Sequence, residues 1–423
     1  MQAPLTDMRS SRQSARDTAS LRWPGDAQSR VPAWIYSDPE IFAREMQVFH
    51  HGPTWNLVAA ECELPVAGSW KRSSIADKSV LVTRDQNGEI HVMENRCTHR
   101  GIALCWKHRG QSRSIVCPYH NWTFDLKGAL KGVPFEHGTK GAGGMPESFD
   151  KAQHGLRKLA VTVRGAAVWA SFSDNPPAFE DYVGPVLPVM DRITTNRRPK
   201  LLGTSRQVID CNWKLWMENA RDGYHATLLH TFLPAFGLLQ PDTPMGQITP
   251  HEGHVITGQY LPVRDKTAAD PTAAARPAGS RFLLNDMDVV TTAHDEFGDN
   301  QNIGFQLFPG AMYRQHLNIP SYRQIIPRGP RRTEVQWTIF GDESDDEEMT
   351  LLRLKQANLV GPAGFVLVED SEVLAKIQAS VESYPESVQV TEMGGSDAGK
   401  TQRLVAENGI RAFYTYYRAA MGL

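Results

Sequence analysis

The sequence predicts an α+β protein in which a small all-β domain precedes a larger domain of mixed helices and strands. The length of 423 residues exceeds the ~100–200 residues of one domain, so at least two are expected. Short strand-like runs separated by turn clusters fill the chain from about Trp55 to Arg164, a pattern typical of β-hairpins. From about Pro185 onward, longer helical patterns alternate with strands such as NIGFQLF and TEVQWTIF, which indicates an α+β region.

The chain begins with a segment that shows no hydrophobic periodicity. Residues 1–30 lack the apolar core of a secretory signal and are predicted to be a disordered leader. A helical lead-in is expected at 31–54, where Asp38 can cap a helix and Pro39 suits its first position. We expect this lead-in to belong to the larger domain, which otherwise spans 166–423 and follows the all-β domain at 55–165.

Two later segments have simple structural interpretations. Residues 264–280 are rich in Ala, Pro and Thr without periodicity, which favours a loop or insertion. The acidic run at 342–348 precedes the helical pattern MTLLRLKQANL, and acids in a first turn complement the helix dipole. That run is therefore predicted to be a solvated helix start.

Charge and cysteine content narrow the class of protein. The formal net charge of −2 gives no indication of a nucleic acid or anionic membrane partner. No apolar run approaches the ~18 residues that a membrane helix needs. Five cysteines, an odd number in a long chain, do not form a disulfide framework. The sequence therefore predicts a cytoplasmic protein whose paired cysteines are first considered as metal ligands.

Two loops of the all-β domain each offer one cysteine and one histidine. RCTHRG contains Cys97 and His99, and CPYHNW contains Cys117 and His120. A structural zinc site takes the same ligand types, but zinc modules usually pair Cys with Cys in one loop and His with His in another. The split between loops suits a Rieske [2Fe-2S] cluster, in which one iron takes both cysteines and the other both histidines. Zinc and chance spacing stay open as alternatives to the favoured cluster.

The segment MENARDGYHATLLH carries a second possible metal site with Asp222, His225 and His230. The histidines are five residues apart, about 140° around a helix, so a shared metal requires the helix to loosen or end between them. Two histidines and one carboxylate on one face of Fe(II) leave positions open for O₂. Asp370, in an apolar helical stretch, is the candidate carboxylate because a buried acid needs a cation or strong hydrogen bonds. Glu369 is expected to face solvent.

These segments resemble the large (α) subunit of Rieske non-heme iron aromatic-ring-hydroxylating oxygenases. The motifs CTHRG…CPYHNW, NWKLWMENARDGYHATLLH and GPAGFVLVEDSEV occur in the order of that family, and the resemblance covers nearly all of the chain after the leader. It implies a Rieske domain followed by a catalytic domain whose antiparallel sheet is covered by helices. It also implies one cluster and one mononuclear Fe(II) per chain, the latter bound by His225, His230 and Asp370.

The same resemblance implies roles for two further residues and several partners. Asp222 would hydrogen-bond His225 and, across a subunit boundary, a cluster ligand matching His120, and so pass electrons between chains. Asn219 would lie near the iron without being a firm ligand. The segment GAGG follows EHGTK rather than a strand, so it fails as a dinucleotide loop. A ferredoxin and an NADH-dependent reductase are therefore expected, together with a small β subunit in an α3β3 assembly.

In its overall amino-acid sequence the chain resembles family members that act on aromatic carboxylates. Anthranilate is the leading prediction, dihydroxylated with O₂ to catechol with loss of ammonia and CO₂, and 2-halobenzoate, salicylate and terephthalate remain alternatives. An anionic ring needs a cationic anchor, for which Arg323 is the first candidate and Arg403 the second. Two other classes of protein stay open as alternatives. A pure Rieske electron carrier needs only about one domain, and a zinc hydrolase would use His225 and His230.

Overall fold

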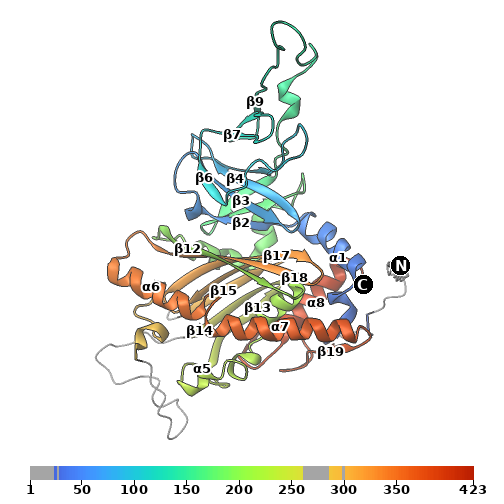
Figure 1. Ribbon diagram of the computed structural model, residues 1–423. Helices are drawn as coiled ribbons and strands as arrows, with labels where there is room; N and C mark the ends of the chain where they lie inside the picture. The colour runs from blue at the N-terminus through green and yellow to red at the C-terminus, as the bar shows by residue number, and fades with distance from the viewer. Residues whose placement is uncertain (1–22, 26–27, 261–284, 298–300) are drawn as a thin grey trace, which may run out of the picture.

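The computed structural model describes residues 23–25, 28–260, 285–297 and 301–423, and it consists of a β-rich upper unit and a larger lower unit (Figure 1). The predicted insertion at 264–280 and most of the predicted leader lie outside the described residues. At the described end of the leader, Trp23 is buried with its ring 5.6 Å from that of Tyr414, and Arg30 begins the first strand. That part of the segment is packed on the lower unit.

The lead-in contributes to the core of the lower unit. It contains β1 (Arg30–Pro32), a 3₁₀ turn (Ala33–Tyr36), α1 (Pro39–Glu45) and a π-helical turn (Met46–His50). Asp38 caps α1 as predicted, because its Oδ1 accepts hydrogen bonds from the backbone N–H groups of Glu40 and Ile41 at 2.8 and 3.0 Å. β1 pairs with β19 (Val388–Val390), near the other end of the chain.

The upper unit consists of short antiparallel strands in three small sheets, which confirms the predicted hairpins. β10 (Ala160–Arg164), β11 (Ala167–Ser171) and β2 (Asn56–Ala60) form one sheet. A second contains β5 (Ile90–Glu94), β4 (Lys78–Arg84), β3 (Ser69–Ile75) and β6 (Arg109–Gln111), and a third contains β7 (Ser114–Val116), β8 (Thr123–Asp125) and β9 (Leu130–Gly132). Burial alternates residue by residue along β3, as expected for a strand with one face on a core.

The lower unit is built on an eight-stranded antiparallel sheet, which confirms the predicted α+β class. The strands follow the order β12 (Pro199–Ile209), β18 (Arg332–Asp342), β17 (Ile319–Gly329), β16 (Ala311–His316), β15 (Gln301–Leu307), β14 (His254–Tyr260), β13 (Pro244–His251) and β20 (Thr401–Arg403). Short helices α2 (Phe179–Val183) and α3 (Leu187–Arg192) lead into this unit.

Helices cover the sheet and enclose the main core. They are α4 (Trp213–Asn219), α5 (Phe232–Ala235), α6 (Glu347–Val360), α7 (Phe365–Ser383) and α8 (Asn408–Met421), and α6 and α7 run across one side of the sheet in Figure 1. The acidic run is a solvated helix start only in part: Asp346 caps α6, because its Oδ1 accepts from the Met349 N–H at 2.8 Å, whereas Asp342 is buried. Within the described ranges, no helix is both long and apolar enough to cross a bilayer.

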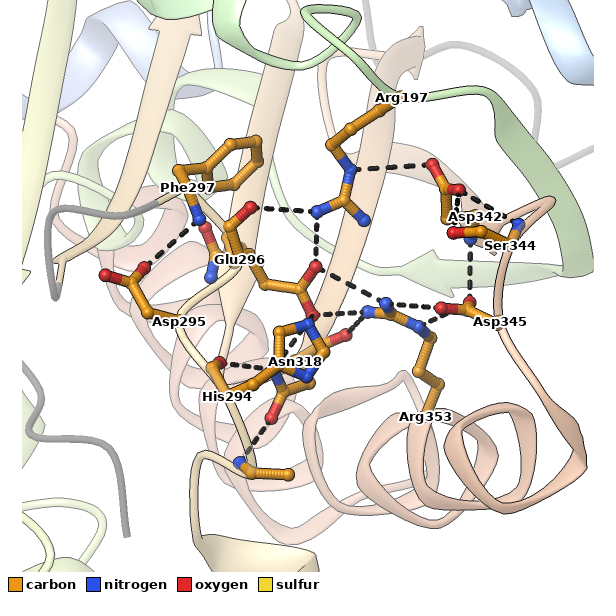
Figure 2. Close-up of polar contacts among 12 residues, drawn as sticks. Arg197, His294, Asp295, Glu296, Phe297, Asn318, Asp342, Ser344, Asp345 and Arg353 are labelled. Carbon is orange, nitrogen blue, oxygen red and sulfur yellow. Dashed lines mark hydrogen bonds and ion pairs between the residues drawn. The ribbon is translucent and has the colours of Figure 1, made fainter.

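A buried ionic network fixes α6 to one end of the sheet. Figure 2 shows Arg353 of α6 between Glu296 and Asp345, with 2.7 Å from Nη1 to Glu296 Oε1 and from Nε to Asp345 Oδ2. Arg197 binds the same Glu296 carboxylate from the other side. Burial alone would raise the pKa of Glu296, but a His294 hydrogen bond and the two guanidinium groups hold it far below its usual range.

Candidate functional site

The polar segment after α4 places two histidines beside each other because the helix ends before them. α4 stops at Asn219, the chain turns through Gly223, and a 3₁₀ turn covers His225–Thr227. The interruption predicted from the five-residue spacing is therefore present. The rings of His225 and His230 lie 5.3 Å apart between centroids. Ala in place of Gly223 would put a Cβ 2.3 Å from the Leu404 carbonyl oxygen, so this turn needs glycine.

Asp370 on α7 joins the two histidines from a distant part of the sequence. Its Oδ1 lies 3.6 Å from His225 Nε2 and 3.3 Å from His230 Nε2. One ligand atom from each of the three residues lies within 4.8 Å of the others, a spacing that could hold a metal ion. Asp370 is 5% exposed, and two imidazoles with one carboxylate are the donor set of a facial triad. The residues therefore fit a mononuclear iron.

Two polar side chains contact this group from α4 and the turn that follows. Asn219 Nδ2 lies 3.2 Å from Asp370 Oδ1, as a donor, and 3.4 Å from His225 Nε2. Asp222 Oδ2 lies 3.1 Å from His225 Nδ1, while its Oδ1 accepts the Tyr224 N–H at 2.7 Å. A carboxylate on Nδ1 favours the tautomer that leaves Nε2 free as a ligand. Asp222 therefore orients His225.

Glu369 corrects one expectation from the sequence. It was expected to face solvent, but its Oε2 lies 2.7 Å from His230 Nδ1, with the side chain 34% exposed. Burial lowers the pKa of His230, and the hydrogen bonds and charges of Asp370 and Glu369 more than offset that effect. Each histidine thus has a carboxylate on Nδ1 and directs Nε2 toward Asp370. The one feature of the sequence that could have indicated this contact is the pair of adjacent acids in an apolar stretch.

A cavity of about 260 Å³ opens next to these side chains. This size is near the lower end of the ~300–1,000 Å³ typical of ligand pockets, which suits a single ring. Apolar groups such as Trp216, Leu239, Val290 and Met312 form much of its wall, together with the three arginines Arg221, Arg314 and Arg323. A mainly apolar wall limits the access of water to a reacting ring.

The structure separates the two arginines proposed from the sequence. Arg323 lines the cavity and is 4% exposed, with its guanidinium 3.8 Å from the centre of the Trp337 ring. Its Nε and Nη2 are buried without a hydrogen-bond partner, and burial lowers its pKa to about 9. Arg403 is exposed on β20 and does not line the cavity, whereas the next residue, Leu404, does. Successive residues of an extended chain point to opposite sides, so we leave Arg403 out of the proposed anchor.

The four Cys/His residues of the upper unit also come together. Both loops have the same backbone pattern: Cys97 N–H donates to Ile102 O and Cys117 N–H to Trp122 O, each at 2.8 Å. Both cysteines are 1% exposed and neither forms a disulfide. The ring centroids of His99 and His120 are 4.7 Å apart. Two buried thiols that contact each other and two more exposed imidazoles fit the ligand set of a Rieske cluster.

The two candidate centres lie in different units. The cysteine and histidine loops adjoin β7 and the small sheets of the upper unit, whereas the His225 group lies beside α7 in the lower unit (Figure 1). Among the described residues one further acid and histidine group has metal-ligand spacing, namely Asp85, Glu89 and His91. The Lys127 ammonium binds Asp85 and Glu89 at 2.9 and 2.8 Å, so that position already holds a cation.

Comparisons with known proteins agree with this division. A family model described as Rieske [2Fe-2S] domain matches residues 54–143, and one described as ring hydroxylating alpha subunit (catalytic domain) matches residues 190–423. The large oxygenase component of salicylate 5-hydroxylase from Ralstonia sp. is 38% identical over 95% of this chain and 96% of its own. The anthranilate 1,2-dioxygenase large subunit of Burkholderia cepacia is 38% identical over 97% of both chains.

Further matches extend the set of similar proteins. Terephthalate 1,2-dioxygenase terminal oxygenase component subunit alpha 2 from Comamonas sp. is 35% identical over 95% of this chain and 98% of its own. The structure of naphthalene 1,2-dioxygenase from Rhodococcus sp. bound to indole superposes with a TM-score of 0.75, covering 93% of this chain and 94% of that one at 24% identity. At that identity the structural likeness speaks for the fold.

Proposed function

Because this chain belongs to the ring-hydroxylating oxygenase α subunits, oxidoreductases that combine a Rieske [2Fe-2S] domain with a mononuclear iron domain, we propose that it hydroxylates an aromatic carboxylate. The observation that carries the substrate class is Arg323. A buried guanidinium with two unpaired donors in the wall of the cavity needs an anionic partner. Salicylate, anthranilate and terephthalate, the compounds named for the relatives, all contain a benzoate core.

We assign the metal-binding roles to the two convergent groups. His225, His230 and Asp370 would hold the iron, and the cluster would be held by the cysteines and histidines of the upper unit, Cys97, His99, Cys117 and His120. When bound, the iron and the cluster supply oxygen activation and single electrons, respectively. The domain boundaries that accompany this assignment are 55–165 for the cluster domain and 166–423, with the 31–54 lead-in, for the catalytic domain.

The surrounding side chains bind and orient. Arg323 would hold the substrate carboxylate by charge-assisted hydrogen bonds and so direct the ring toward the iron ligands. Asp222 and Glu369 would keep the two histidines in one tautomer and one orientation. Asn219 would restrain Asp370 through its amide. The apolar cavity wall would exclude water from the ring.

The proposal includes partners that supply electrons and complete the assembly. Separate units for the two centres support transfer between neighbouring chains through Asp222. We therefore propose an α3 arrangement with a small β subunit, supplied by a ferredoxin and an NADH-dependent reductase. The names "large subunit" and "large oxygenase component" of the relatives are consistent with additional components.

A single-turnover experiment tests the proposed function without its partners. The protein is reduced with dithionite under nitrogen, freed of reductant, and mixed with O₂ and one of anthranilate, 2-chlorobenzoate, salicylate or terephthalate. Mass spectrometry should detect a product carrying ¹⁸O from ¹⁸O₂ with at least one of them, and catechol from anthranilate if that prediction holds. Hydroxylation of none, together with an intact cluster spectrum, would favour a pure electron carrier.

Two variants and a matched control assign the roles. His225→Ala should keep the cluster spectrum, lose the additional iron and form no product. Arg323→Met should keep both metals and lose product because the carboxylate has no anchor. Arg328→Met is the control, since Arg328 lies on the same strand but binds Glu334 at 3.0 Å outside the cavity lining. Unchanged product formation in Arg323→Met would refute the assigned anchor.

A further inference from the structure

Arg314, a residue that the sequence did not single out, brings a second cation into the same cavity. Met312, Arg314 and His316 alternate along β16, so their side chains point to one face of the sheet, and all three line the cavity. Arg323 of β17 stands opposite Met312 in the strand register. Arg314 and Arg323 therefore occupy diagonal positions on one face of neighbouring strands, within reach of a common ligand.

Neither guanidinium has an ionic partner among the described residues. Arg314 Nη1 donates to the Thr257 hydroxyl at 2.5 Å, and Arg323 Nη1 contacts the Met312 sulfur at 3.6 Å. Burial lowers the pKa of Arg314 to about 10, so it remains charged at neutral pH. Burial, followed by the charge of Arg314, likewise lowers the pKa of Arg323 to about 9, and it also stays charged. Two like charges thus share one wall.

The other titratable groups facing this wall do not neutralise it. Burial and the two guanidinium groups hold the pKa of His316 well below its usual range, so His316 is neutral. The third lining arginine, Arg221, donates from Nε to Gln306 Oε1 at 2.9 Å, and its guanidinium lies 4.7 Å from the centre of the Phe413 ring. Asp370 faces the histidines at 3.3 and 3.6 Å, where the proposed iron would take up its charge. Among the three lining arginines, Arg314 and Arg323 are the pair that share one face of neighbouring strands and can bind one ligand together.

We infer that the substrate is an aromatic dianion, with one oxyanion group on Arg323 and a second on Arg314. A monoanion would leave either the buried Arg323 guanidinium or the half-buried Arg314 guanidinium without a counter-charge, which is costly where little water reaches the group. An ortho amine would fare worse than a second carboxylate, because an amine offers hydrogens to a cationic donor. The inference rests on the proposed function and refines it: it favours a benzene dicarboxylate or a sulfobenzoate over anthranilate.

Binding to the purified holoprotein tests this without any variant. Calorimetry compares terephthalate with its monomethyl ester, which keeps the para-substituted ring and removes one charge, and 4-sulfobenzoate with benzoate and anthranilate. We expect each dianion to bind roughly tenfold or more tightly than its monoanionic counterpart. Equal affinity for terephthalate and its monomethyl ester, or tighter binding of anthranilate than of every dianion, would overturn the inference.

Variants assign the difference to Arg314. Arg314→Met should remove the preference for the dianions and change the Kd of benzoate by less than about threefold, because benzoate keeps Arg323. Arg314→Lys should restore part of the preference, and Arg328→Met should resemble the wild type. Equal weakening of benzoate and terephthalate in Arg314→Met, with unaltered melting temperature and cluster spectrum, would contradict the assigned role.

The outcome separates this inference from the proposed function. If benzoate binds and is hydroxylated while the dianions gain nothing, the dianion inference fails and the aromatic-carboxylate function stands. If none of these carboxylates binds to the wild type, both fail.

Discussion

Removing the Glu369 carboxylate should weaken metal binding at the His230 site although Glu369 itself is not a proposed ligand. Its Oε2 lies 2.7 Å from His230 Nδ1, and His230 Nε2 faces Asp370 at 3.3 Å. In Glu369→Ala the imidazole loses its acceptor and is free to rotate or to change tautomer. Carboxylates that orient metal-binding histidines contribute about 10–100-fold to affinity, or about 1.4–2.7 kcal/mol.

The structure places this variant at the lower end of that range. The Glu369 side chain is 34% exposed, so solvent screens part of its charge. We therefore expect a loss of roughly tenfold in affinity. Glu369→Gln should lose less, because its amide oxygen can still accept from Nδ1. Glu372→Ala serves as the control, since Glu372 lies one turn further along α7 and pairs with the exposed Lys376 at 2.8 Å.

Metal titration of protein stripped of its mononuclear iron gives the affinity directly. Fe(II) or Co(II) is added under nitrogen in competition with a chromophoric chelator, and acid-labile sulfide is measured to show that the cluster is intact. The expected order of affinity is wild type and Glu372→Ala, then Glu369→Gln, then Glu369→Ala. Wild-type affinity in Glu369→Ala would show that the 2.7 Å contact does not orient His230, and the reasoning would be refuted.

Three further outcomes follow from other contacts. Asp222→Asn should retain both metals but lower single-turnover product roughly 10–100-fold, because the contact to His225 loses its charge; product at the wild-type level would exclude a bridging role. Arg323→Met should raise the stability of the ligand-free protein by about 1 kcal/mol, because relief of two unsatisfied buried donors outweighs the lost stacking on Trp337; a lower melting temperature in differential scanning calorimetry would contradict this. His254 donates from Nε2 to Tyr182 O and accepts the Phe308 N–H at Nδ1, and burial lowers its pKa to about 3. The folding stability that neutral His254 contributes is therefore full above pH 6.5 and is lost as the pH falls from 6.5 toward 3. Buried His50 and His316 contribute to the loss over the same range, so denaturant unfolding at pH 7.5 and pH 5 should show that His254→Gln loses about 2 kcal/mol less than the wild type. An equal loss in the variant and the wild type would assign it to other groups.

The cluster loops illustrate what local sequence can predict. In each loop the cysteine and histidine are two or three residues apart, so the backbone of a single turn determines their relative position. The same holds for Asp38 and Asp346, whose capping bonds join residues two or three positions apart. These features depend on the geometry of a few consecutive residues, so the local amino-acid sequence is sufficient to predict them.

The iron site was predictable only in part. The five-residue spacing of His225 and His230 required an interrupted helix, and the structure has one. Asp370 was selected because a buried acid needs a partner, but its distance from the histidines depends on how α7 packs beside α4. The expectation that Glu369 faces solvent is wrong because Glu369 and Asp370 are neighbours on α7, and only the packing of that helix decides which groups each side chain contacts.

The amino-acid sequence by itself determined the fold class, the cluster motif and the donor types at the second centre, because strand and helix periodicity and ligand spacing are local properties. Tertiary structure decided which distant side chains share a cavity. Arg314 and Arg323 come together through the register of β16 and β17, and Arg403 turns outward while Leu404 turns inward. Burial then gives those groups their chemistry: an arginine on the surface is solvated, whereas the same side chain buried in a largely apolar cavity wall needs an anion.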